Sequence, residues 1–347
     1  MKLVFKMTNQ ILHQLPPYDE LSSLLKTFSS VTLDTVSELS DVEAFPPFSE
    51  DFEHADLPLD SMLAEELEII PLTPADRSLP VIACDMSTVK IADTTRGSLW
   101  AVRGSIVMRE AGIVKAAVVG PFAYTVSNQT TERILDVLFI CLNLEREPSF
   151  LHMSTAPKII SNLFEKVLQA YAATRLKGGI LLIDGALTAG PSDSPTAAVE
   201  KIVESAKTHG IGVAAFSKST TLTYFGRRIT CLRSRCRPPY VIRLPLSSNR
   251  PWGVVNGSVY VSHLSSTPTP FRVDVASTTS DEEVFTHILS SEPMVHGYPE
   301  SLILAHQLAK LRWIDVVGIR AGLESHAKLR FASDIDVRSM LFAPIEG

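Results

Sequence analysis

Two aspartates that follow strongly apolar segments are the residues best suited to do chemistry. Asp85 comes directly after the run 81–84 (VIAC), and Asp184 comes directly after the run 180–183 (ILLI). A continuous apolar run is typical of a strand that is buried on both faces. A carboxylate at such a place is costly unless a metal ion or a hydrogen-bond donor compensates its charge.

If the two strands are parallel neighbours, the two aspartates lie side by side. Close carboxylates repel one another unless they share a proton or bind a cation. Hard oxygen ligands without a cysteine or histidine cluster favour Mg²⁺ or Mn²⁺, and two such ions ~4 Å apart can activate water at a phosphodiester. The alternative is that each aspartate caps the loop or helix after its strand.

A third carboxylate is expected from a helix beside the sheet. Glu165 is the candidate, because it lies on a strongly amphipathic helical segment and precedes Asp184 by 19 residues. It flanks the apolar stripe of that helix, so it is also compatible with an ordinary surface glutamate. Competing carboxylates are Glu132, Asp136 and Glu110.

Two basic side chains could reach the same edge of the sheet. Lys218 follows a third apolar strand and could neutralise a phosphate or position the attacking water, or it could be a solvated residue at a strand end. His306 lies about two turns into a helix expected to begin near Pro299. It could bind a metal ion or a phosphate, or it could be a structural histidine.

A basic run stands out in a chain whose net charge is −6. Alternating residues share one face of a strand, where guanidinium groups could follow a phosphate backbone. The alternative is an edge strand protected by charge. The arginines of this run are Arg227, Arg228, Arg233, Arg235 and Arg237.

The order of the expected elements predicts an α/β fold. Strands over 81–119, with turns at Gly97 and Gly104, form an antiparallel meander, and strands at 180–183 and 211–216 flank a helix as a parallel pair. An antiparallel meander followed by parallel strands is the order found in the ribonuclease H topology. This topology is a mixed sheet flanked by helices. Residues 1–75 are predicted to form an N-terminal helical extension and an acidic connector, and 76–347 the main domain.

Composition limits the class of protein. The chain has 347 residues, of which 45% are hydrophobic, and its four cysteines are scattered without a zinc-site spacing. Reduced thiols fit an intracellular, cytoplasmic protein. Neither a signal peptide nor a membrane-spanning run is recognisable.

Taken together, the ordered segments over residues 78–310 resemble the NurA nuclease family. They are the strands ending in Asp85-Met86-Ser87 and in 184–187 (DGAL), the strand end 217–219 (SKS), and Tyr298-Pro299 leading to Ala305-His306. The resemblance implies a ribonuclease H-like, Mn²⁺-dependent nuclease that acts on DNA, with single-strand endonuclease and 5′ to 3′ exonuclease activities. It also implies a homodimer that docks on a hexameric HerA-type ATPase in DNA end resection.

The resemblance also implies roles for individual residues. Asp85 and Asp184 match the metal-binding aspartates, Glu165 the helical glutamate, His306 the histidine after the Tyr-Pro pair, and Lys218 a basic residue near the site. Met86 stands where the family pattern has glycine, so strain is expected in the turn after Asp85. Ala186 replaces a usual serine.

Two other functions remain open at this point. The chain could be a catalytically degenerate DNA-binding or translocase-adaptor module on the same fold. It could also be a different metal-dependent hydrolase, because a fold does not determine a substrate.

Overall fold

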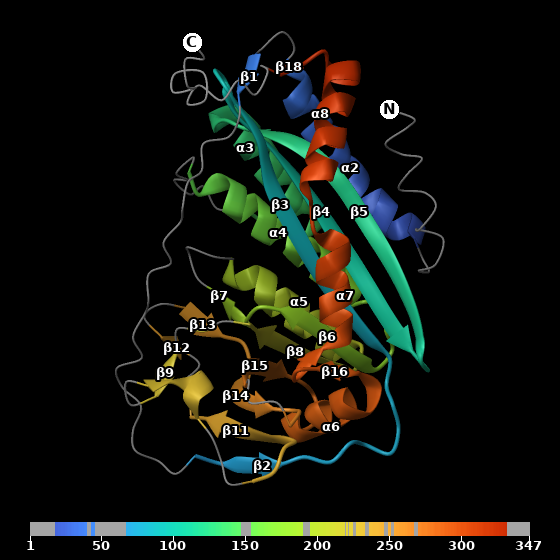
Figure 1. Cartoon of the computed structure of the whole chain (residues 1–347), viewed down its shortest axis with the longest axis vertical. Helices are drawn as coiled ribbons and strands as arrows, with labels where there is room; N and C mark the ends of the chain where they lie inside the picture. Colours follow the sequence, from blue (N-terminus) through green and yellow to red (C-terminus); the bar gives the residue numbers. More distant parts are fainter. Residues whose placement is uncertain are drawn as a thin grey trace, which may run out of the picture.

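The computed structural model describes most of the chain. The described residues are 18–39, 43–45, 67–146, 154–189, 195–218, 220, 222–224, 227–232, 236–245, 249–250, 253–266 and 270–331. Three long antiparallel strands and the helices beside them give the molecule an elongated shape (Figure 1).

A mixed sheet forms the centre of the molecule. Strands β3, β4 and β5 form an antiparallel meander, β6 pairs with β3 in parallel, and β8 pairs with β6 in parallel. This β5-β4-β3-β6-β8 order is the ribonuclease H topology, so the predicted fold is confirmed. The strands are β3 (Val81–Thr94), β4 (Gly97–Glu110), β5 (Ile113–Val126), β6 (Gly179–Asp184) and β8 (Ile211–Ser217).

Further strands extend the sheet beyond this core. Past β8 the order continues β15-β14-β11-β2, all antiparallel, and β1 and β18 add to the far end of β3. These strands are β15 (Phe271–Ala276), β14 (Ser258–His263), β11 (Tyr240–Leu244), β2 (Ile69–Pro71), β1 (Glu43–Phe45) and β18 (Arg330–Phe331). Short ladders are β9 (Thr223–Tyr224) with β10 (Arg227–Arg228), β12 (Asn249–Arg250) with β13 (Gly253–Val255) and β7 (Thr188–Ala189), and β16 (Met294–Val295) with β17 (Tyr298–Pro299).

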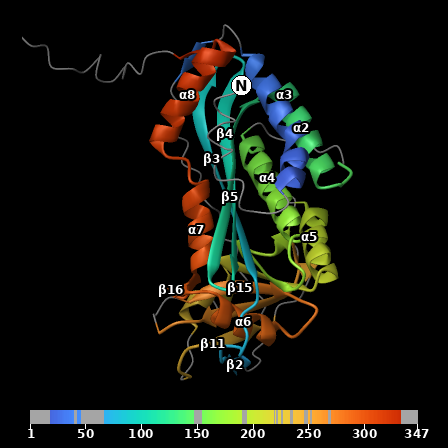
Figure 2. The ribbon, with the colours of Figure 1, turned by 90° about the vertical axis from the view of Figure 1, so that its right-hand side faces the viewer.

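Helices cover both faces of the sheet (Figure 2). One face carries α2 (Tyr18–Ser37), α3 (Asn128–Cys141), α4 (Ala156–Ala172) and α5 (Thr196–Thr208). The opposite face carries α7 (Glu300–Ala309) and, farther along, α8 (Trp313–Ala327), while α6 (Asp281–Ser291) packs near the base of α7. Separate apolar clusters fill the two faces, as expected for a sheet buried between helical layers.

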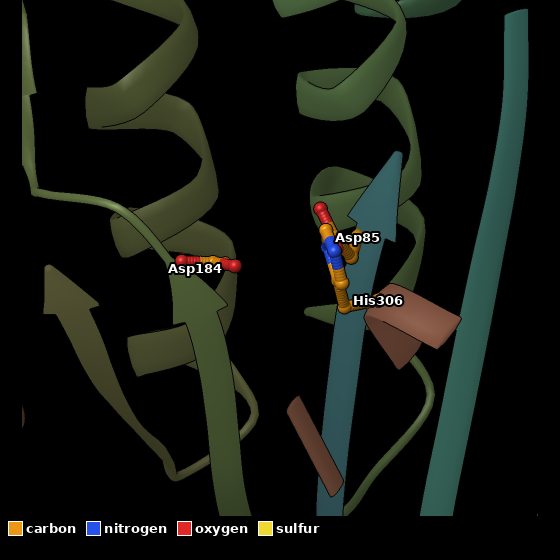
Figure 3. A group of neighbouring side chains, drawn as sticks. All are labelled: Asp85, Asp184 and His306. Atoms are coloured by element: carbon orange, nitrogen blue, oxygen red, sulfur yellow. The ribbon is translucent and has the colours of Figure 1, made fainter. Parts of the chain in front are cut away.

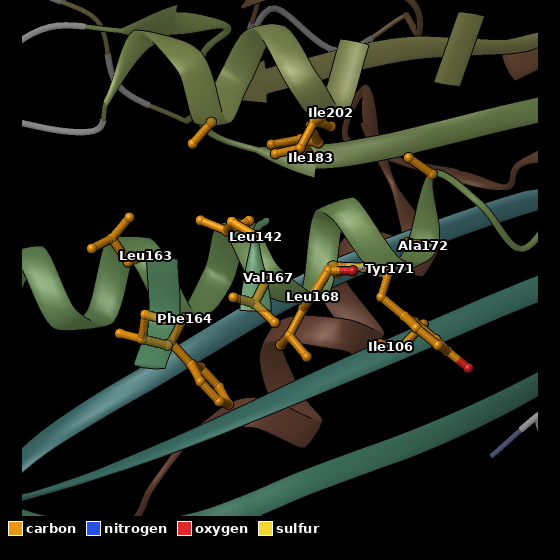
Figure 4. Packing of buried hydrophobic residues seen from close by; sticks show 14 of the residues in the cluster. Ile106, Leu142, Leu163, Phe164, Val167, Leu168, Tyr171, Ala172, Ile183 and Ile202 are labelled. Atoms are coloured by element: carbon orange, nitrogen blue, oxygen red, sulfur yellow. Dashed lines mark hydrogen bonds between the residues drawn. The ribbon is translucent and has the colours of Figure 1, made fainter. Parts of the chain in front are cut away.

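The stripe predicted on α4 is the main contact of that helix with the sheet. Ile160, Leu163, Phe164, Val167 and Leu168 each expose no more than 1% of their surface. They recur at steps of three and four residues, which places them on one side of the helix. They pack with residues of the central strands in the larger apolar cluster (Figure 4).

The strands of the meander are longer than the sequence predicted. The strand that begins with the run 81–84 was expected to end at Asp85, but β3 continues to Thr94, and its pairing with β4 continues along it. Gly97 does lie at the turn, with φ of +140°, whereas the turn predicted at Gly104 is wrong. Gly104 lies inside β4, at the point where α4 approaches closely.

Residues on both sides of position 75 take part in this arrangement. Helix α2 packs against β5, and β2 pairs with β11. The division of the chain at residues 75 and 76 stays a proposal. In the part of the chain described here, each helix is too short or too polar to cross a bilayer.

We predict that Gly104→Ala destabilises the protein by about 1–3 kcal/mol, the usual cost of overpacking a core. An added Cβ would lie 2.3 Å from Leu168 Cδ1 and 3.0 Å from Phe164 Cε1, and both side chains are fully buried. Chemical denaturation measures the change in the free energy of unfolding.

Gly318→Ala is the matched control. A Cβ at Gly318 meets nothing within 4 Å, so alanine there is expected to stabilise α8 by up to about 1 kcal/mol. A Gly104→Ala protein as stable as the unmodified chain would contradict the close approach of α4 to β4.

Candidate metal centre

The centre is built where β3 and β6 stop pairing. Their parallel register ends at Cys84 opposite Ile183, and the next residue on each strand is an aspartate. His306 reaches the same place from α7. One ligand atom from each of Asp85, Asp184 and His306 can be chosen so that all lie within 4.8 Å of one another (Figure 3).

Asp85 does not end its strand, in contrast to the expectation from sequence. It lies within β3, opposite Ser105 of β4, at the point where the other edge of β3 loses its partner β6. Its side chain is 10% exposed. Oδ1 accepts a hydrogen bond from Met86 N–H at 2.7 Å, and Oδ2 lies 2.8 Å from His306 Nδ1.

The pKa of Asp85 is raised above its ordinary value. Burial is the main cause, and the negative charge of Asp184 adds to it, while the contacts with Met86 and His306 act in the opposite direction. The strain expected at Met86 is absent, because this residue continues the extended strand opposite Gly104 and makes no turn.

Asp184 has partners on both carboxylate oxygens. Tyr298 donates its hydroxyl to Oδ1 at 3.0 Å, and Lys218 forms an ion pair with Oδ2. Burial and the charge of Asp184 raise the pKa of Tyr298 above its ordinary value, so this tyrosine stays a donor. Lys218 is about half exposed, with 48% of its side chain accessible, and offsets part of the negative charge.

The loop after Asp184 is fixed by hydrogen bonds. Gly185 turns the chain with φ of +127°, and its carbonyl accepts from the Ser217 hydroxyl at 2.7 Å. Leu187 N–H donates to Asp274 at 2.9 Å, and Arg272 donates two 2.7 Å hydrogen bonds to the same carboxylate. The loop is therefore tied to both β8 and β15.

Glu165 lies outside the group formed by the two aspartates and His306. Its Oε1 accepts a 2.7 Å hydrogen bond from Gln169 Nε2. After burial, the charge of Glu165 is the next contribution to the raised pKa of Cys84, the residue before Asp85. The charge of Glu165 thus reaches the residue before Asp85, and its role as a ligand stays a prediction.

The competing carboxylates are engaged elsewhere. Glu132 and Asp136 both pair with Arg146, at 2.6 and 2.8 Å, on the exposed side of α3. Glu110 is exposed at the β4–β5 hairpin. Neither location is part of the group around Asp85.

The basic run is described only in part. Arg228 and Arg237 are exposed. The side chain of Arg227 and the whole of Arg233 and Arg235 lie outside the described residues, so the expected alternation on one face of a strand is left as a prediction.

Several residues around the centre were not expected from sequence. Tyr298 was noted only as part of a Tyr-Pro pair, and the available signal was its place just before the helix that carries His306. Arg272 and Asp274 carry a signal of their own, since opposite charges two residues apart share one face of an otherwise apolar strand. Gln169 gave no signal beyond its position one turn after Glu165.

The donor atoms fit a hard divalent cation. Two carboxylates and an imidazole converge without a cysteine, a set compatible with Mn²⁺ or Mg²⁺. The raised pKa of Asp85 also fits, because burial and, next, the charge of Asp184 disfavour the ionised carboxyl, and a bound cation would offset both effects.

Comparisons with solved structures give distant likenesses. A NurA nuclease from Sulfolobus solfataricus is 12% identical, with a TM-score of 0.45 over 94% of this chain and 98% of that one. A NurA crystallised with manganese is 10% identical, with a TM-score of 0.39 over 75% of this chain and 91% of that one. Endonuclease V from Bacillus subtilis is 11% identical, with a TM-score of 0.35 over 74% of this chain and 88% of that one.

Likenesses of this size define no correspondence between residues, and the fold assignment rests on the strand order of this chain. No curated protein matches the sequence. The family model of the NurA domain, in contrast, matches residues 39–311 of the sequence. This range includes the five central strands of the sheet and His306. The chain therefore belongs to the NurA domain family.

Proposed function

We propose that the protein is a metal-dependent nuclease that hydrolyses phosphodiesters of DNA. The observation that carries the proposal is the convergence of Asp85, Asp184 and His306, with ligand atoms within 4.8 Å, in a chain of the NurA domain family. Mn²⁺ is the proposed ion, and Mg²⁺ is the alternative.

Asp85, Asp184 and His306 would hold the first ion, and Glu165 would help to hold a second. A bound divalent ion supplies positive charge that lowers the pKa of water and stabilises a leaving oxygen. The protein's part is to keep the carboxylates ionised and oriented. Tyr298 does this for Asp184 through the 3.0 Å hydrogen bond to Oδ1.

Lys218 has a second role in this proposal. Its ammonium pairs with Asp184 and is about half exposed, so it can move to a phosphate when a cation takes over the charge of the aspartate. A lysine at that place would neutralise charge that develops on the phosphate during cleavage. The five arginines between 227 and 237 would follow the backbone of the bound strand.

The finer features of the function are proposals on the same basis. They are single-strand endonuclease and 5′ to 3′ exonuclease activities, a homodimer, a HerA-type hexameric ATPase as partner, a role in DNA end resection and double-strand break repair, and a cytoplasmic location. The resemblance of the ordered segments between 78 and 310 to NurA nucleases supports them.

We predict that Asp85→Asn and Asp184→Asn each reduce Mn²⁺-dependent cleavage by at least about 100-fold. Loss of a residue that only supports a metal ligand typically costs 10- to 100-fold, and loss of a ligand is expected to cost more. The assay uses end-labelled single-stranded and duplex DNA with Mn²⁺ or Mg²⁺. Labels at the 5′ and the 3′ end distinguish the two polarities of digestion.

Asp136→Asn is the matched control, because this aspartate is exposed on α3 and pairs with Arg146. It should cleave as well as the unmodified protein. Unchanged cleavage in both site variants would refute the proposal. Salt-sensitive DNA binding without cleavage in either metal would instead favour the adaptor function.

We predict that Mn²⁺ binds more weakly as the pH falls, and that the loss begins above the ordinary pKa of an aspartate. The raised pKa of Asp85 means that this carboxyl keeps its proton to higher pH, and the ion must displace that proton. Calorimetry in buffers of different ionisation enthalpy measures both the affinity and the protons released.

The Asp184→Asn variant distinguishes the titration of Asp85 from that of the other ionisable groups. Removal of the neighbouring negative charge lowers the pKa of Asp85, so the onset of proton release should move to lower pH even though the affinity itself is reduced. Equal affinity at about pH 5 and about pH 8, without proton release, would contradict the assignment.

A further inference from the structure

On α4, two buried polar residues form a hydrogen-bonded chain that ends at the half-buried Glu165. We call Lys166, Gln169 and Glu165 the α4 triad. Gln169 is completely buried and Lys166 is only 9% exposed. Side chains of these types are rarely so buried, and their burial is costly unless their polar groups are hydrogen-bonded.

The hydrogen bonds of the α4 triad run in one direction. Lys166 Nζ donates to Gln169 Oε1 at 3.0 Å, and Gln169 Nε2 donates to Glu165 Oε1 at 2.7 Å. An ammonium group can only donate, so the carbonyl of Gln169 must face Lys166 and its NH₂ must face Glu165. The neighbouring cation also polarises the amide and strengthens its donation to the carboxylate.

The amide between the two charges matters for a cation site. A lysine in direct contact with Glu165 would neutralise the carboxylate and compete with a metal ion for its oxygens. Gln169 is neutral, so its hydrogen bond occupies an acceptor position of the carboxylate without itself adding a positive charge.

Glu165 stands outside the compact group of the two aspartates and His306, and its charge acts on residues next to that group. Its charge contributes to the raised pKa of Tyr298, whose hydroxyl binds Asp184, and of Cys84, which precedes Asp85. This arrangement suits a carboxylate that serves a second ion beside the first.

We propose that Gln169, oriented by Lys166, is a positioning residue that holds Glu165 as a ligand for a second divalent cation. The inference rests on the metal-dependent function proposed above and adds a residue to it. Gln169 itself touches neither the ions nor the DNA in this proposal.

The test is Mn²⁺ binding to the full chain without DNA, measured by calorimetry. The unmodified protein should bind two ions, and Glu165→Gln should weaken one of them. Gln169→Met, which keeps the length of the side chain and removes its amide, should weaken the same ion by about 10- to 100-fold. Gln129→Met, at an exposed position at the start of α3, is the matched control and should change nothing.

A second variant separates positioning from stability. Gln169→Met leaves the buried Lys166 without its acceptor, whereas the double variant Lys166→Met/Gln169→Met removes both polar partners and should restore the free energy of unfolding. A purely structural role predicts that Mn²⁺ affinity recovers together with stability. The positioning role predicts that stability recovers and the affinity for the second ion stays low.

The Glu165→Gln background completes the experiment. If Gln169 acts through Glu165, then Gln169→Met has no further effect on Mn²⁺ binding in that background. Additive losses, full affinity in the double variant, or an unmodified protein that binds a single ion would overturn the inference. Binding of two ions without any DNA cleavage would instead refute the nuclease function and leave the positioning role intact.

Discussion

Four pairs of residues in one parallel ladder determine whether the candidate centre exists. Val81 to Cys84 of β3 pair with Ile180 to Ile183 of β6, and because the strands advance in step, the next residue on each is an aspartate. A slip of one residue would turn one aspartate to the opposite face of the sheet. The apolar side chains of both strands resist such a slip, because each face packs into its own cluster.

The ladder creates an electrostatic problem that the neighbouring elements solve in different ways. Asp184 receives a lysine and a tyrosine hydroxyl, and both come from outside its own strand. From the described part of the chain, Asp85 receives a backbone N–H and an imidazole, and its pKa remains raised by burial and by Asp184. Of the two carboxylates, Asp85 is the one whose ionised form is less well stabilised. A cation would therefore contribute most to stability beside Asp85.

The sequence predicted what depends on short-range pattern. The apolar runs before Asp85 and Asp184 mark buried strands whatever their partners, and the strand–helix–strand order around residues 180–216 implies a parallel pair. The length of β3 could not be read in this way, because the strand continues past Asp85 only where β4 pairs with it. The prediction of a turn at Met86 was wrong for the same reason, because Met86 pairs with Gly104 within the long strand.

Residues that approach from other layers were harder to predict. His306 could be proposed as a ligand but not distinguished from a structural histidine, because its contact with Asp85 spans 221 positions and depends on how α7 packs on β3 and β4. The contacts of Tyr298 with Asp184 and of Asp274 with Leu187 span 114 and 87 positions. Gly104 was read as a turn because a glycine in sequence does not reveal whether it serves conformation or close packing.

Helix α4 connects the apolar core to the chemistry of the centre. Its stripe packs on β4 at Gly104, where the absence of a Cβ lets Leu168 and Phe164 approach the strand. Cys84 adds a contact from β3, since its thiol lies 3.8 Å from the carbonyl oxygen of Leu168. Glu165 follows Phe164 directly along the helix. The distance at which α4 packs on the sheet therefore also sets the distance of the Glu165 carboxylate from the sheet. Packing thus sets the position of Glu165 along the sheet, and the hydrogen bond from Gln169 contributes to the orientation of its carboxylate.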